Sequence, residues 1–80
     1  MTFNQLIAKR IRRLMKERNW TQYKLSERSG LPKSTISYTL KGKGESFKTT
    51  TILNICRGFG ISVIDFFNDN SFLPENIADN

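Results

Sequence analysis

Histidine is absent from this chain of 80 residues, and cysteine occurs once, at Cys56. Histidine is the commonest general base in enzymes and the commonest metal ligand in proteins, so its absence argues against most hydrolytic and metal chemistry. A single cysteine can form neither an internal disulfide nor a thiolate metal cluster. The seven carboxylates are not spaced as an acid/base pair. We therefore predict a protein that is not an enzyme and has no metal or other cofactor, and no small-molecule ligand is evident.

Long apolar runs are also missing from the sequence. No stretch approaches the roughly 18 apolar residues that a membrane span needs. Near the N-terminus, Lys9 and Arg10 lie within a periodic apolar pattern, which is not the order of a signal peptide. We expect a cytoplasmic protein that does not bind membranes.

The length and the apolar content limit the number of domains. Apolar residues make up 38% of the chain, and two cores drawn from 80 residues would each be too small to be stable. We expect one domain over residues 1–68. The segment 69–80 is polar apart from Phe72, Leu73 and Ile77. It is predicted to be a tail that is either loose or docked through these three residues on the body or on a partner.

Acidic residues are scarce in the first part of the chain. The net charge is +6, and residues 1–48 hold twelve of the thirteen lysines and arginines against three acids. Residues 49–80 hold one arginine against four acids. This uneven distribution of charge favours a basic face that binds a polyanion, and nucleic acid is favoured over a membrane. A basic surface that is simply solvated explains the charge alone almost as well.

The apolar residues and the capping residues predict an all-α chain of short helices. Thr2 and Gln5 have the spacing of a capping box, and Asn19 and Gly30 suit left-handed helix ends. On the first helix, Lys9, Arg12, Arg13 and Lys16 are expected to project away from the apolar stripe. Trp20 is predicted to be a structural contact rather than a platform for bases. Cys56 is interpreted as a small core residue. The helices are predicted at about residues 2–18, from the N-cap Thr21 to 29, 33–41, from 49 or 50 to 59, and from Ser62 to 67 or 68.

The segment from Thr21 to Lys41 has the spacing of a helix-turn-helix. Two helices joined by a tight turn approach closely, so the first needs a small residue, which Ser26 supplies. The turn needs a positive φ, which Gly30 adopts at little cost. Many helical hairpins have a glycine in the turn, so this spacing alone is moderately specific. The residues predicted to be buried between the two helices and the first helix are Leu25, Leu31, Ile36 and Leu40.

If Ile36 and Leu40 point inward, the opposite face of the helix 33–41 carries no acid. A helix that enters the phosphate-lined major groove needs such a face. The predicted base-contacting residues are Lys33, Ser34, Ser37 and Tyr38. The predicted phosphate-contacting residues are Gln22, Thr21, Lys41, Lys43, Lys48 and Thr49. An ordinary polar helix face, and for each lysine a solvated position, are the alternative interpretations.

Several segments together resemble the Cro/phage-repressor (Cro/C1) type of helix-turn-helix regulator. They include Trp20-Thr21-Gln22, the run from Gly30 to Ser37, Phe59-Gly60-Ile61-Ser62 and Asp65-Phe66-Phe67, and the resemblance covers about Leu6 to Phe67. It implies a compact five-helix, lambda-repressor-like domain that acts on operator DNA, usually as a homodimer on a near-palindromic site. It also implies that Gln22 contacts phosphate and that the residues predicted above to contact bases do so.

We therefore predict a sequence-specific DNA-binding transcriptional regulator, and a repressor rather than an activator, that inserts the helix 33–41 into the major groove of double-stranded DNA. The main alternative is a protein-interaction module, such as an antitoxin-like component that binds DNA secondarily. In that case Phe72, Leu73 and Ile77 would contact the partner. A catalytic domain is the third alternative, which the lack of histidine disfavours.

Overall fold

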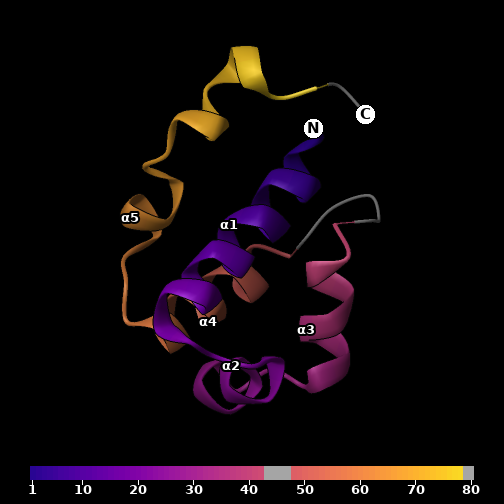
Figure 1. The fold of residues 1–80 in the computed structure, drawn as a ribbon, viewed down its shortest axis with the longest axis vertical. Helices are drawn as coiled ribbons and strands as arrows, with labels where there is room; N and C mark the ends of the chain where they lie inside the picture. The colour runs from indigo at the N-terminus through magenta and orange to yellow at the C-terminus, as the bar shows by residue number, and fades with distance from the viewer. Residues whose placement is uncertain (43–47, 79–80) are drawn as a thin grey trace.

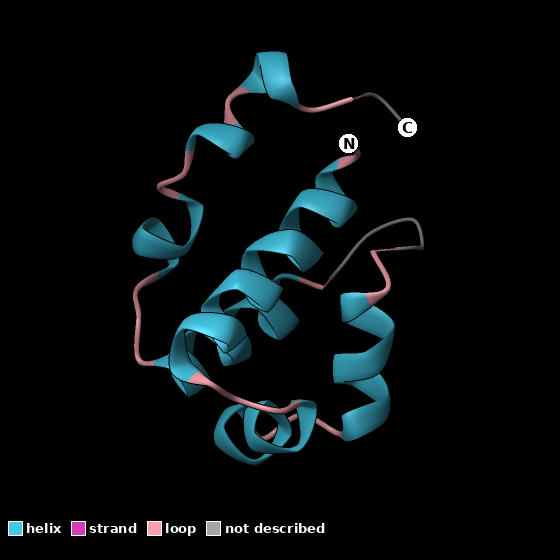
Figure 2. Cartoon of the chain, viewed as in Figure 1, coloured by secondary structure: helices cyan, strands magenta, loops and turns pink. Residues whose placement is uncertain are grey.

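The computed structural model describes residues 1–42 and 48–78, and Figure 1 shows their path. Within these residues five α-helices are followed by two short 3-10 helices, and Figure 2 contains no strand. The prediction of an all-α, five-helix fold is therefore confirmed. The elements are α1 (Phe3–Arg18), α2 (Gln22–Ser29), α3 (Lys33–Leu40), α4 (Thr49–Phe59), α5 (Val63–Phe67), η1 (Asn70–Phe72) and η2 (Pro74–Asn76).

Hydroxyl side chains cap the starts of three helices, and the capping box at Thr2 and Gln5 was predicted from the sequence. Thr2 Oγ1 accepts from the Gln5 amide at 3.2 Å, while Gln5 Oε1 accepts from the Thr2 amide at 2.9 Å, which completes a capping box. Thr21 accepts from the Lys24 amide in α2, and Ser62 caps α5 in the same way. Each cap satisfies an amide that has no acceptor inside its own helix.

The core lies where α1, α2, α3 and α4 meet. Leu25, Ile36 and Leu40 are buried as the helix-turn-helix pattern predicted, and Leu31 packs against them with part of its surface exposed. Figure 1 shows α1 running through the middle of the molecule, with α3 on one side and α5 on the other. The buried cluster comprises Ile7, Ile11, Leu14, Leu25, Ile36, Leu40, Ile55, Cys56, Phe59 and Phe66.

Burial also determines the chemistry of Cys56. The residue is 1% exposed, and this burial raises the pKa of its thiol, although the positive charge of Arg10 acts in the opposite direction. A raised pKa lowers the fraction of reactive thiolate. Its position agrees with the interpretation as a core residue.

Residues 69–78 pack along the body of the domain. The Phe72 ring meets the Phe67 ring edge-on with centroids 4.9 Å apart, and the Phe3 ring of α1 stacks on Phe67 with centroids 6.1 Å apart. Phe3 retains 39% of its exposure beside this segment, so it is not part of the buried core. The Ala78 amide donates to the Met1 carbonyl at 2.8 Å, so the end of the described chain returns to its beginning (Figure 1).

A polar contact holds the same segment at its start. Asp69 accepts from the amide and hydroxyl of Ser71 and forms an ion pair with Arg13 of α1. The hydrogen bond from the Ser71 amide, and next that from Arg13, hold the pKa of the Asp69 carboxyl well below its usual range. Arg13 is exposed as predicted, but it also makes this specific contact with a residue 56 positions away.

Among the described residues, no helix has both the length and the apolar character that crossing a membrane requires.

Candidate nucleic-acid interface

The turn between α2 and α3 is held by a side chain from the first of these helices. Ser26 Oγ donates to the Leu31 carbonyl at 2.6 Å, and the Gly30 amide donates to the Ser26 carbonyl at 3.0 Å. Gly30 has a φ of +74°, a conformation that costs other residues energy. Gly30 therefore adopts the positive φ that the spacing predicted, and Ser26, predicted only as a small residue, also holds the turn through its hydroxyl.

A close approach between α2 and α4 positions the first helix of the motif. A Cβ atom at Gly58 would lie 3.0 Å from both the Cα and the N atom of Ser29, so only glycine fits without movement. Gly58 carried no signal in the sequence that would have predicted this role. From the sequence alone, a glycine inside a helix indicates only a lower helix propensity. Its role in a close contact becomes visible only when the position of the neighbouring helix is known.

Helix α3 is fixed along its inner side and at its end. Ile36 and Leu40 are buried, and the Thr39 hydroxyl donates to the Thr35 carbonyl at 2.8 Å. Arg12 of α1 donates from Nη2 to the Leu40 carbonyl at 2.9 Å. A guanidinium at this position satisfies a terminal carbonyl and interacts favourably with the helix dipole. Arg12 was predicted only to project outward, so this contact with α3 is a further role.

The outer face of α3 is open to solvent. Lys33, Ser34 and Tyr38 are exposed, and Ser37 is half-buried. No acid occurs between Lys33 and Leu40. The N-cap residue Pro32 forms no side-chain hydrogen bond with the helix, so the first amides of α3 also face this open end. The face is therefore accessible and carries no charge that repels phosphate.

The residues predicted to contact phosphate lie at the ends of three helices. Thr21 and Gln22 are exposed at the start of α2, and Lys41 is exposed directly after α3. The Thr21 oxygen accepts from the Lys24 amide, which leaves its hydroxyl proton able to donate. Thr49 is exposed as the first residue of α4. Lys43 lies outside the described residues.

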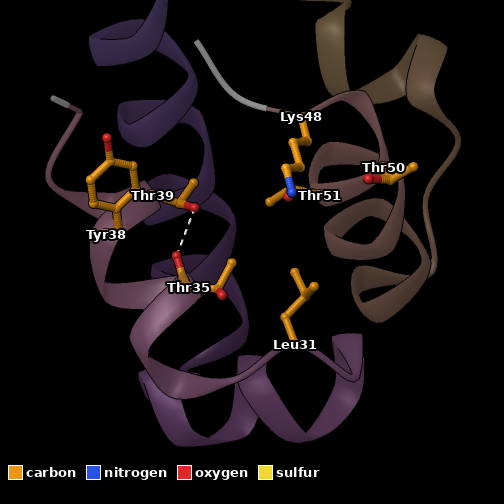
Figure 3. Close-up of a pocket in the computed structure, with 7 residues that line it drawn as sticks. All are labelled: Leu31, Thr35, Tyr38, Thr39, Lys48, Thr50 and Thr51. Carbon is orange, nitrogen blue, oxygen red and sulfur yellow. Dashed lines mark hydrogen bonds between the residues drawn. The ribbon is translucent and has the colours of Figure 1, made fainter. Parts of the chain in front are cut away.

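A cleft of about 420 Å³ separates α3 from the start of α4 (Figure 3). Tyr38 lines it from α3, and Lys48 lines it from the residue before α4, with the Lys48 side chain directed into the cleft beside Thr51. Leu31 and Thr35 line its lower end in this view. The fold thus brings one residue predicted to contact bases and one predicted to contact phosphate to the same cleft.

An aromatic residue that the sequence analysis did not select lies beside Lys33. Tyr23 in the first turn of α2 is 62% exposed, and the Lys33 Nζ atom lies 5.9 Å from the centroid of its ring. Trp20, in contrast, stacks on Phe59 with ring centroids 5.1 Å apart. Trp20 is therefore engaged in packing, whereas the Tyr23 ring is available at the surface.

Comparisons with known proteins agree with this geometry. The family model of the Cro/C1-type HTH DNA-binding domain matches residues 10–71, which is most of the chain. No curated protein and no solved structure matches the chain. The matched region runs from α1 through η1 and includes the whole helix-turn-helix. The chain therefore belongs to the Cro/C1-type helix-turn-helix DNA-binding domains, a family of DNA-binding regulators.

Proposed function

We propose that the protein is a sequence-specific transcriptional repressor that inserts α3 into the major groove of operator DNA. The observation that carries this proposal is the accessible, acid-free outer face of α3. The ammonium group of Lys33 suits the acceptors of guanine, and hydroxyl groups bond to several base edges. The proposed base-contacting residues are Lys33, Ser34, Ser37 and Tyr38.

Phosphate contacts hold α3 in this orientation. The proposed residues are Thr21 and Gln22 at the start of α2, Lys41 directly after α3, and Lys48 and Thr49 at the start of α4. Lys43 is proposed as well, although it lies outside the described residues. Backbone amides at helix starts and lysine side chains are common phosphate ligands, and they set the register without reading sequence. Repression then follows from occupancy, because a bound protein excludes others from the same DNA.

A homodimer is the proposed form on DNA, and the cytoplasm is the proposed location. A dimer with two-fold symmetry binds two half-sites whose centres lie about 34–36 Å apart, one turn of the double helix. Selection of bound sequences from a random pool of duplexes is expected to recover an inverted repeat with this spacing. A single unrepeated site would contradict the homodimer while leaving the contacts of α3 intact.

The first test measures DNA affinity at several salt concentrations. Binding is expected to weaken steeply with salt because phosphate contacts release counterions. Lys48→Ala should reduce the salt slope by about one for all sequences. Arg57→Ala is the matched control, because it removes one positive charge from the opposite end of the same helix. Little DNA binding at any salt concentration would favour the protein-interaction module instead.

The second test measures sequence preference. Ser34→Ala and Tyr38→Ala are expected to change the selected bases, while Arg57→Ala retains them. An unchanged preference in both α3 variants would overturn the assignment of the reading face. The alternative interaction module would contact its partner through Phe72, Leu73 and Ile77. Phe72 already packs against Phe67 in the domain, so its ring is engaged within the fold.

A further inference from the structure

The pair formed by Tyr23 and Lys33 joins the two helices of the motif on their exposed side. Tyr23 is the second residue of α2, and Lys33 is the first residue of α3. The Lys33 ammonium nitrogen lies 5.9 Å from the ring centroid, within the range of a cation–π interaction. Both side chains are exposed, so neither is placed there by burial in the core.

The location of Lys33 makes such a neighbour useful. The N-terminus of a helix carries a partial positive charge, so the lysine ammonium is repelled by the end of its own helix. Pro32 supplies no side-chain hydrogen bond there. The lysine side chain is also long and flexible, and ordering it for a base contact costs entropy. The negative face of the Tyr23 ring attracts the ammonium toward α2 and limits its range of positions.

We propose that Tyr23 is a positioning residue that orients Lys33 for base recognition. The proposal rests on the proposed function of α3 and adds to it a residue from the other helix of the motif. The aromatic ring performs this role, and the hydroxyl group is not required. Discrimination at the base pair that Lys33 reads therefore depends on Tyr23, although Tyr23 itself lies on α2.

A double-mutant cycle tests the coupling. The variants are Tyr23→Leu, Tyr23→Phe, Lys33→Ala and the Tyr23→Leu/Lys33→Ala double variant, each measured on the selected site and on sites changed at one base pair. An exposed cation–π contact predicts a loss of about two- to fivefold in preference at the pair read by Lys33 in Tyr23→Leu. Tyr23→Phe should stay within about twofold of the original protein. The double variant should match Lys33→Ala, because the two residues act as one unit.

Two results of this cycle would overturn the proposal. One is an equal loss in Tyr23→Phe and Tyr23→Leu, which would assign the effect to the hydroxyl. The other is independent effects of Tyr23→Leu and Lys33→Ala, which would multiply in the double variant. Thermal unfolding of every variant separates a loss of fold from a loss of orientation.

A measurement without DNA keeps the two proposals distinguishable. The methylene protons of Lys33 next to the ammonium should show an upfield NMR shift from the Tyr23 ring, retained in Tyr23→Phe and absent in Tyr23→Leu. Lys16, an exposed lysine of α1, is the control. No such shift in the original protein would overturn the positioning role, even if Tyr23→Leu fails to fold. A protein that shows the shift but selects no DNA sequence would overturn the proposed function instead.

Discussion

Replacing Gly58 with alanine tests how α4 positions the first helix of the motif. The new methyl carbon would lie 3.0 Å from the Cα and N atoms of Ser29 and 3.2 Å from the carbonyl carbon of Arg28. Optimal separations between carbon atoms are about 3.5–4.0 Å. All three atoms belong to the backbone, so no side chain can rotate out of the way. We expect α2 to move away from α4 by several tenths of an ångström.

The expected cost combines two opposing terms. Overpacking a close contact costs about 1–3 kcal/mol, and rigid backbone on both sides favours the upper half of that range. Alanine in place of glycine within a helix recovers about 1 kcal/mol. The expected net loss is about 1–2 kcal/mol, which for a domain of this size lowers Tm by roughly 5–15 °C.

Thermal and urea unfolding followed by circular dichroism measure this loss. Arg57→Ala is the control, because this exposed neighbour in α4 should change stability by less than about 0.5 kcal/mol. Gly30→Ala provides a second comparison, since a Cβ there meets no atom within 4 Å and any cost comes from its φ of +74°. A higher Tm for Gly58→Ala would refute the reasoning, because it would show helix propensity acting without a steric conflict.

Two further predictions concern side chains outside the α3 face. Asp69→Asn should lower Tm at pH 7, because the lowered pKa of Asp69 makes the charged carboxylate stabilising above its usual pKa of about 3.9. This contribution is lost as the pH falls below that value, so the difference in Tm between Asp69→Asn and the original protein should shrink at pH 3. A difference in Tm that stays constant would contradict the prediction. Glu75→Gln, at an exposed carboxylate, is the control. Cys56 should react slowly with a thiol reagent in the native protein and rapidly in denaturant, since burial raises the pKa of its thiol. Rapid native reaction would contradict the buried position.

Local signals in the sequence predicted most of the fold. A hydroxyl side chain at a helix start can accept from a free amide three residues later, so Thr2, Thr21 and Ser62 could be identified as caps without any tertiary information. Gly30 could be identified in the same way from the turn. The periodic apolar residues then specified which side of each helix faces inward, and their burial is a consequence of helical geometry.

Contacts between distant segments could not be predicted by this reasoning. Arg12 is separated by 28 positions from Leu40, whose carbonyl it contacts, and Arg13 by 56 from Asp69. Both were assigned to a solvated face, because a basic residue opposite an apolar stripe gives no sign of a specific acceptor. Gly58 was missed for the same reason, since its role depends on how closely α2 approaches.

The candidate site was predicted unevenly. The exposed face of α3 follows from the burial of Ile36 and Leu40, so the sequence indicated it directly. Tyr23 belongs to another helix, and its proximity to Lys33 depends on the angle at which the turn joins the two. The cleft shared by Tyr38 and Lys48 likewise depends on the path from α3 to α4.

Photochemical cross-linking tests the central claim most directly. Position 5 of thymine projects into the major groove, so 5-iodouracil placed at each thymine of the selected site should cross-link to an inserted α3. The account predicts attachment to the tryptic peptide of residues 34–41, which contains Tyr38. Cross-links found only in peptides from α4 to η2 would contradict the insertion of α3 into the groove.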